Sequence, residues 1–146
     1  MIKTQMTKEQ YESFATKITE RCEEFINQPV IDFGYDEPDV RTLNVDCLHT
    51  GKQWLIKMLT HAFQQQRKWN EPLIFPMDNG GWRFEWDSIH TNKEKHINQA
   101  LYIDFDPAGH YGSLEVIDNE HVERDDDTLE RLETALLSYL TRMESY

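Results

Sequence analysis

Apolar residues recur every three or four positions in three stretches of the chain, which is the spacing that puts them on one face of a helix. The stretches are residues 7–27, 54–63 and 129–143. In the first of them, Thr7 and Gln10 have the spacing of a capping box, a side-chain arrangement that begins many helices. We therefore expect two helices in the N-terminal half of the chain and one at its C-terminus.

In the C-terminal half the pattern changes to alternating apolar and polar residues, the period of a half-buried β-strand. Three segments show it: WRFEWDSI (82–89), INQALYIDF (97–105) and GSLEVID (112–118). In the third segment, alternation predicts that Leu114 and Val116 face the core and that Glu115 faces solvent. The connections are the polar residues 90–96 and the turn sequence 106–109, so the simplest topology is an antiparallel meander.

The remaining segments are less regular. Residues 30–49 show no sustained period; we interpret 30–33 as a short strand and 36–39 as a turn, and the remainder is a candidate beginning of the next helix. Two prolines and a double glycine interrupt residues 69–81 and leave room for a short edge strand at 73–75. Helices followed by strands and a final helix are typical of the α+β class. We predict a single domain, residues 1–146, with two N-terminal helices and one C-terminal helix packed on the apolar face of a three- to four-stranded antiparallel meander.

The composition narrows the range of partners. The chain carries 27 acids and 15 bases, a formal net charge of −12, whereas proteins that bind nucleic acid or anionic membranes need a basic surface. The two cysteines, Cys22 and Cys47, lack the spacing of a zinc ribbon or a disulfide framework, which favours reduced thiols. There is no signal-peptide core and no long apolar window. We expect a cytoplasmic protein that binds no membrane, no nucleic acid directly and no cofactor.

The negative charge is concentrated near the C-terminal end of the predicted sheet. Between Glu115 and Glu130 there are eight acids and a single base, Arg124. Two interpretations are open. One is a solubilising surface, with residues 125–127 at the positive end of the last helix dipole; the other is a docking surface for a cationic protein. The predicted docking surface consists of Glu115, Asp118, Glu120, Glu123, Asp125, Asp126 and Asp127. Trp69 is a candidate aromatic residue of an interface, and packing in the core, the favoured alternative, is the other interpretation of it.

A second hypothesis concerns catalysis. Alternation along the predicted strands gathers carboxylates on one face of the sheet, and hydrolases that work with two metal ions need such clusters. The candidate residues are Glu85, Asp104, Asp106 and His110. The same alternation also produces an ordinary solvated face, and no HExxH, GxSxG or phosphate-binding glycine loop occurs in the chain. The favoured interpretation therefore includes neither a catalytic residue nor a metal.

The segments GGWRFEW (80–86) and LYIDFDPAGHYGSLEV (101–116) resemble a strand-turn-strand pattern of small bacterial and phage-associated proteins, in which a glycine pair leads into a strand containing Glu-Trp. As a small, acidic, cysteine-poor α+β chain, the protein also resembles immunity proteins and antitoxins, which neutralise nuclease toxins. This resemblance implies a non-catalytic inhibitor that presents carboxylates to a basic nuclease or another nucleic-acid enzyme. An oligomeric scaffold or small-ligand sensor is the remaining alternative.

Overall fold

The computed structural model describes residues 6–92 and 95–144, which form three helices and seven strands. In chain order these are α1 (Lys8–Asn27), β1 (Val30–Asp32), β2 (Val40–Thr42), α2 (Val45–Gln64), β3 (Leu73–Pro76), β4 (Trp82–Asn92), β5 (Lys95–Phe105), β6 (Tyr111–Ile117), β7 (Glu120–Asp127) and α3 (Leu129–Met143). β1 and β2 form a separate hairpin, whereas β3 to β7 form one antiparallel sheet in sequence order. The fold is α+β, as predicted, with a larger meander than expected.

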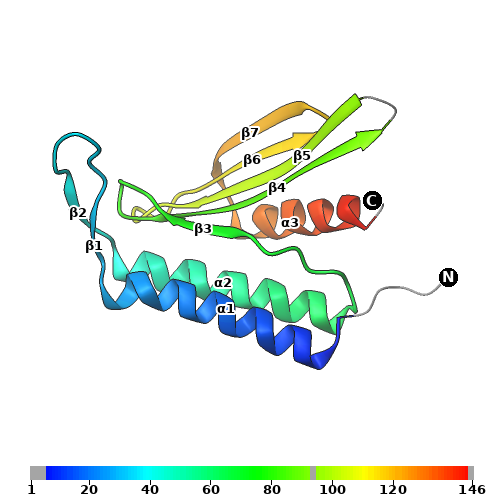
Figure 1. Ribbon diagram of the computed structural model, residues 1–146, viewed down its shortest axis with the longest axis horizontal. Coiled ribbons are helices and arrows are strands. Elements are labelled where there is room, and N and C mark those ends of the chain that lie inside the picture. Colours follow the sequence, from blue (N-terminus) through cyan, green and yellow to red (C-terminus); the bar gives the residue numbers. More distant parts are fainter. Residues whose placement is uncertain (1–5, 93–94, 145–146) are drawn as a thin grey trace.

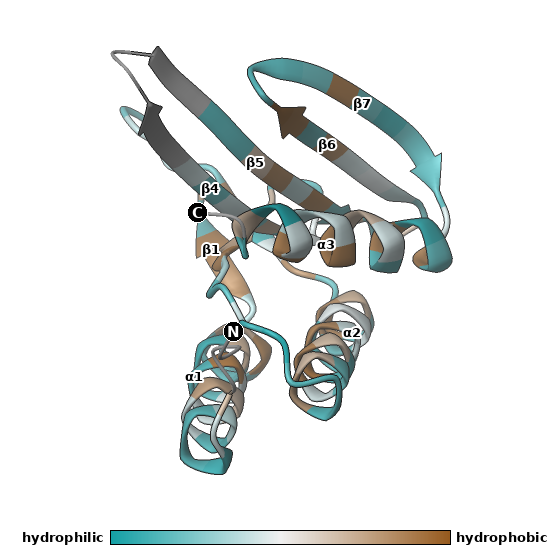
Figure 2. Ribbon diagram, turned by 90° about the vertical axis from the view of Figure 1, so that its right-hand side faces the viewer, coloured by the Kyte–Doolittle hydropathy of each residue, from teal (hydrophilic) through white to brown (hydrophobic). Residues whose placement is uncertain are grey.

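All three helices lie on the same side of the five-stranded sheet (Figures 1 and 2). α1 packs against α2, α2 contacts β4 and β5, and α3 contacts β5 and β6. No helix of the described residues covers the opposite side, which we call the outer face. The helix-covered side is the inner face. Among the described helices, none has the length and apolar character that crossing a bilayer requires.

Side-chain caps explain where α1 and α2 begin. At α1, the Thr7 hydroxyl accepts a hydrogen bond from the Gln10 backbone N–H at 3.1 Å. The Gln10 side chain accepts one from the Thr7 N–H at 2.9 Å, which confirms the capping box. α2 begins at Val45, within the segment that was a candidate for its first turns, because the Asn44 side chain caps it through the Cys47 N–H at 2.9 Å.

The inner face of the sheet is aromatic. Trp82, Phe84 and Trp86, at alternate positions of β4, are each no more than 1% exposed, as their alternation predicts. The Trp82 Nε1–H donates to the Leu48 carbonyl oxygen of α2 at 3.0 Å. Gly51 lies against the same ring, since a Cβ atom there would be 2.5 Å from Trp82 Cδ1. The missing side chain at Gly51 therefore lets α2 approach the sheet.

Two strand predictions are wrong. β4 and β5 extend through most of the segment 90–96 that was expected to be a loop, as far as the pair Asn92 and Lys95. β7 was not predicted, because its sequence EHVERDDD holds one aliphatic residue, Val122, and no alternation. Its position follows instead from the turn Asp118-Asn119, where both φ angles are positive, at 50° and 72°. Such angles are typical of a two-residue hairpin loop, which returns the chain beside β6.

For Leu114 and Glu115 of β6 the inward and outward positions are the reverse of those predicted, whereas Val116 is buried as expected, at 4% exposed. Leu101 of β5 is opposite Glu115, and its neighbour Tyr102 is opposite Leu114. Directly opposite residues of an antiparallel pair lie on the same face. Glu115 is therefore on the inner face, where it is 6% exposed, and Leu114 is on the outer face. Burial of Glu115 is tolerated because Arg124 compensates its charge, with 2.8 Å between Arg124 Nη1 and Glu115 Oε2.

Candidate functional site

The outer face carries charged and polar side chains from four neighbouring strands. The register places Arg83 opposite Asp104. One position further along, Glu85 is opposite Tyr102. A hollow of about 360 Å³ lies over these strands, and its charged and apolar lining includes Arg83, Glu85, Tyr102, Asp104, Leu114, Glu123 and Asp125. The hollow therefore joins β4, β5, β6 and β7 in one surface.

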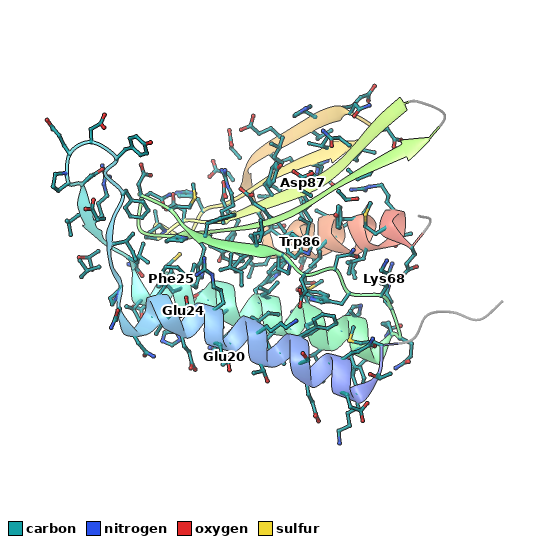
Figure 3. The ribbon with its side chains drawn as sticks, in the orientation of Figure 1. Glu20, Glu24, Phe25, Lys68, Trp86 and Asp87 are labelled. Carbon is teal, nitrogen blue, oxygen red and sulfur yellow. The ribbon has the colours of Figure 1, made fainter. Side chains whose placement is uncertain are left out.

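Asp87 extends this surface along β4. Figure 3 shows Asp87 on the side of β4 away from the helices and its neighbour Trp86 on the side toward them. The Asp87 carboxylate accepts a hydrogen bond from the Tyr102 hydroxyl at 3.1 Å. Burial and this hydrogen bond raise the pKa of Tyr102, so its hydroxyl stays protonated and donates at neutral pH.

Arg83 organises the centre of the outer face. Its Nε is 2.7 Å from Asp104 Oδ1 and its Nη2 is 3.0 Å from Asp104 Oδ2, a two-pronged pair that fixes both side chains. The hydrogen bond to Asp104 raises the pKa of Arg83, and Glu85 lies 4.0 Å from Arg83 Nη1. Arg83 thus neutralises part of the negative charge at this point.

The outer face nevertheless keeps an excess of negative charge. Arg124 also lines the hollow, but its charge is compensated by its ion pair with Glu115. The remaining five carboxylates and the guanidinium of Arg83 sum to −5 + 1 = −4; the carboxylates are Glu85, Asp87, Asp104, Glu123 and Asp125. Glu123 and Asp125 are exposed on β7 and have no ion-pair or hydrogen-bond partner within the described residues. An unpaired carboxylate on an open sheet face is available to a cationic partner.

The structure separates the predicted docking acids into two groups. Asp118, Glu120, Glu123, Asp125 and Asp126 are exposed in the β6–β7 turn and along β7. Glu115 and Asp127 are buried, so their assignment to a docking surface is wrong. The Asp127 carboxylate accepts from the Ser113 hydroxyl at 3.0 Å and lies 3.0 Å from Arg131 Nε. Glu115 and Asp127 therefore join β6 and β7 to their neighbours rather than facing a partner.

The last helix spans Leu129–Met143, the stretch that the apolar pattern predicts. Residues 125–127 end strand β7 and do not form the first turn of α3. Thr128 caps α3 instead, with its hydroxyl accepting from the Arg131 N–H at 3.2 Å. Asp126 has a positive φ of 53° where the register between β6 and β7 shifts, and its carboxylate lies 2.7 Å from His110 Nδ1. The bulge turns Asp126 toward the β5–β6 turn and away from the helix dipole.

Trp69 is not an exposed interface residue, and that prediction is wrong. It is 5% exposed and packs edge-on against Trp86, with 6.4 Å between the ring centroids. The position after α2 suggested exposure, but the chain turns back there toward β3 and carries the ring into the core.

The residues proposed for a metal-dependent hydrolase lie in three different arrangements. Glu85 and Asp104 both contact Arg83, so the guanidinium group already occupies the space between these two carboxylates. Asp106 lies in the β5–β6 turn and accepts from the Ala108 N–H at 2.6 Å, whereas His110 pairs with Asp126. Within residues 6–92 and 95–144, no group of three or more His, Cys, Asp or Glu residues is placed to hold a metal ion.

The two thiols are poor candidates for nucleophiles. Both cysteines are buried and free. Burial raises the pKa of Cys22 to about 12 and that of Cys47 to about 11, so neither forms a thiolate at neutral pH. The Cys47 Sγ–H instead donates to the Phe105 carbonyl oxygen at 3.4 Å. Both thiols belong to the packing between helices and sheet.

Two residues of the outer face, Arg83 and Tyr102, were missed by sequence reasoning. The signal was present, since both stand at polar positions of alternating strands, next to acids that were noted. Their partners Asp104 and Asp87 could not be paired without the strand register. Comparison with protein-family models, curated proteins and solved structures found no match to this chain.

Proposed function

We propose that this is a non-catalytic binding protein whose outer face docks on a basic protein partner. The observation that carries the proposal is the helix-free sheet face with a net charge of −4, on which Glu123 and Asp125 have no partner within the described residues. A field of one sign speeds the encounter with an oppositely charged protein and selects against acidic ones. A flat sheet face also presents its side chains in rows without any loop having to rearrange.

A nuclease or another nucleic-acid enzyme is the partner whose chemistry fits best, and we propose that the protein inhibits it. Such enzymes hold the phosphates of their substrate in a cationic groove. Residues i and i+2 of a strand stand about 6.6 Å apart on one face. Glu85 and Asp87 therefore form a short row of negative charges, with Glu123 and Asp125 across the sheet. A row of carboxylates competes with phosphates for the same cations.

The test compares two variants that remove the same charge from different surfaces. The outer-face variant is E85Q/D87N/E123Q/D125N. The control variant is E9Q/E20Q/D36N/E37Q, which neutralises four exposed acids of α1 and the β1–β2 loop. Each tagged protein is incubated with native extract at low salt, and the bound proteins are eluted with rising salt and identified.

The expected result is a basic nucleic-acid enzyme that elutes early with salt, is captured by the wild type and the control variant, and is lost from the outer-face variant. The purified enzyme should lose activity on nucleic acid when wild-type protein is added, and nucleic acid should compete for binding. Equal capture by the outer-face variant contradicts the docking face. Capture without inhibition contradicts only the proposed inhibition and leaves the docking face standing.

A further inference from the structure

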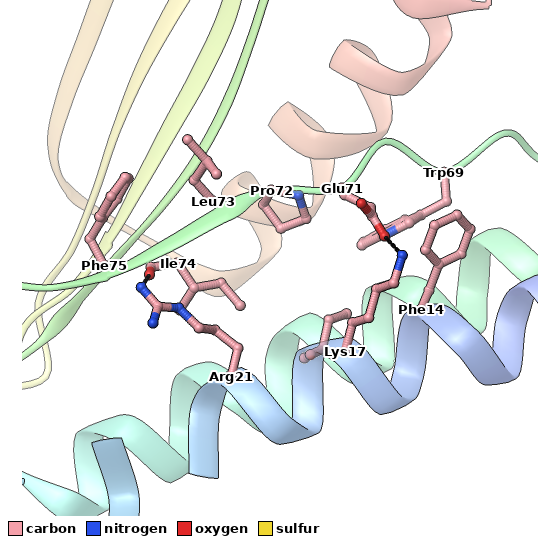
Figure 4. A pocket seen from close by; sticks show the side chains of 10 residues that line it. Phe14, Lys17, Arg21, Trp69, Glu71, Pro72, Leu73, Ile74 and Phe75 are labelled. Atoms are coloured by element: carbon pink, nitrogen blue, oxygen red, sulfur yellow. Dashed lines mark hydrogen bonds and ion pairs between the residues drawn. The ribbon is translucent and has the colours of Figure 1, made fainter. Parts of the chain in front are cut away.

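A second candidate site lies at the edge of the sheet, between β3, the segment that leads into it, and α1 (Figure 4). It is a pocket of about 240 Å³. Its lining is mainly apolar and consists of Phe14, Ile18, Trp69, Pro72, Leu73, Ile74 and Phe75, with Lys17, Arg21 and Glu71 as the charged members. For comparison, a cavity of about 150 Å³ lined by apolar side chains binds benzene. The pocket therefore has room for an aromatic ring and a short chain.

One polar atom in the wall of this pocket has no partner. Trp69 is 95% buried, being 5% exposed, and its Nε1–H has no hydrogen-bond acceptor in the described part of the chain. Of the other three tryptophans of this core, Trp82 and Trp86 donate to the carbonyl oxygens of Leu48 and Asn70, whereas the Nε1–H of Trp54, like that of Trp69, has no acceptor in the described part of the chain. A buried N–H without an acceptor is costly and uncommon in native proteins. A ligand oxygen beside Trp69 would satisfy it.

Two cations flank the pocket on α1. In Figure 4, Lys17 lies with Glu71 and Trp69 at one end of the pocket, and Arg21 lies at the other end near Ile74. Lys17 Nζ is 3.1 Å from Glu71 Oε1, in a pair that is largely exposed. A lysine in such a pair is weakly held and can exchange its carboxylate for another one.

Arg21 closes the other end of the pocket. Its Nη2 donates to the Ile74 carbonyl oxygen at 3.0 Å and its Nη1 to Glu24 at 3.1 Å. The first bond uses an outward-facing backbone acceptor of edge strand β3, so it blocks the addition of another strand there. Small molecules, rather than extended peptides, are therefore the ligands that this pocket admits.

We propose that the pocket binds small apolar carboxylic acids, with the apolar body against Phe14, Ile18 and Phe75. The carboxylate displaces Glu71 as the partner of Lys17 and accepts the hydrogen bond of Trp69 Nε1–H. Three observations support the assignment: an apolar pocket of suitable volume, a lysine whose ion-pair partner is an exposed carboxylate, and a buried donor without an acceptor. The proposal does not depend on the function proposed for the outer face.

The experiment titrates the ¹⁵N-labelled protein with 3-phenylpropionate and follows the indole N–H signal of Trp69 by NMR. The neutral alcohol 3-phenylpropanol serves as the matched ligand. Loss of one signal in the W69F variant assigns the Trp69 peak. We expect saturable displacement of this peak by the acid, at concentrations up to about 10 mM, the range of weak small-ligand binding. The alcohol should bind more weakly because it cannot pair with Lys17.

Three single-charge variants sharpen the test. K17Q should weaken binding of the acid about two- to fivefold, the effect of one exposed ion pair. E71Q should strengthen it, because it frees Lys17 and removes a competing negative charge. K8Q changes the charge of the same helix away from the pocket and should leave the affinity unchanged. No saturable shift of the Trp69 signal overturns the proposal, and so does equal binding of acid and alcohol.

Discussion

The two faces of the five-stranded sheet are built from the same strands and differ in almost every physical property. On β4, Trp82, Phe84 and Trp86 are buried against the helices, whereas the intervening Arg83 and Glu85 lie on the open side. Removing apolar rings from water is the main stabilising contribution to folding, and exposed charges contribute little. The inner face therefore determines stability and leaves the outer face free to carry the charge that binding requires.

The comparison is sharpest where acids appear on both faces. Glu115 and Asp127 lie inward and are bound by Arg124 and Arg131. Glu123, only a few residues away, is exposed and unpaired within the described residues. Sequence position alone does not separate these acids, because a β-bulge near Asp126 changes which residues of β7 face inward. The same acidic stretch therefore contains buried acids that hold the strands together and exposed acids that face solvent.

The largest expected difference between the two faces is in the free energy of unfolding that is lost when an aromatic side chain is removed. F84A should lower the free energy of unfolding by about 3–5 kcal/mol, because it leaves a cavity among Trp54, Trp82 and Phe105. Y102A, at an outer position of the neighbouring strand, should cost clearly less, since Tyr102 is only half-buried. Urea unfolding measures both. Losses of similar size would mean that the outer face is also part of the core.

The next difference concerns the acids of β7. D127A should cost about 2–3 kcal/mol, because it removes the partner of Arg131 and of the buried Ser113 hydroxyl. D125A removes an exposed carboxylate without a partner in the described chain and should stay within about 0.5 kcal/mol of the wild type. The same urea unfolding experiment compares them. If D125A were as destabilising as D127A, the division of the acidic stretch would be wrong.

A smaller difference is expected between two glycines. G51A places a Cβ atom 2.5 Å from the buried Trp82 ring and should cost about 1–3 kcal/mol, even though alanine favours helix. G112A, in β6, meets nothing closer than the Arg124 carbonyl oxygen at 3.6 Å, an ordinary contact. Its effect should be clearly smaller in thermal unfolding. If G51A left the thermal stability unchanged, α2 and β4 would be able to move apart without loss of stability, which would contradict the close packing of α2 against β4.

The smallest effect on stability is expected from the outer-face variant E85Q/D87N/E123Q/D125N. Removing like charges from one surface relieves repulsion, while loss of the Arg83–Glu85 contact at 4.0 Å removes little. We expect a free energy of unfolding within about 1 kcal/mol of the wild type, and closer still at high salt because salt screens exposed charges. A large destabilisation would show that the acids of the outer face serve the fold.

Much of the fold could be predicted from local patterns. The capping box at Thr7 and the alternation of Trp82, Phe84 and Trp86 act within a few residues, so the sequence displays them directly. The register of β6 could not be predicted, because alternation assigns apolar residues to the core by default. Glu115 lies inward, where it pairs with Arg124, which is nine positions away and stands on the neighbouring strand β7.

The sequence predicts that the candidate site is acidic, but it does not predict which residues form it. The excess of acids near the C-terminal end of the sheet is visible in the sequence, and Glu123 and Asp125 are exposed as expected. Arg83 and Tyr102 belong to the same surface through cross-strand contacts with Asp104 and Asp87, which depend on strand pairing. Trp69 was misplaced because the turn that buries it depends on tertiary packing.

The central claim is that the outer face binds and the inner face stabilises. The most direct test is calorimetric titration of the captured basic partner with wild-type protein, the outer-face variant and the control variant E9Q/E20Q/D36N/E37Q at two salt concentrations. We predict that the outer-face variant loses about tenfold or more in affinity with little remaining salt dependence, whereas the control variant stays within about twofold. Equal affinity of the outer-face variant and the wild type would contradict the claim.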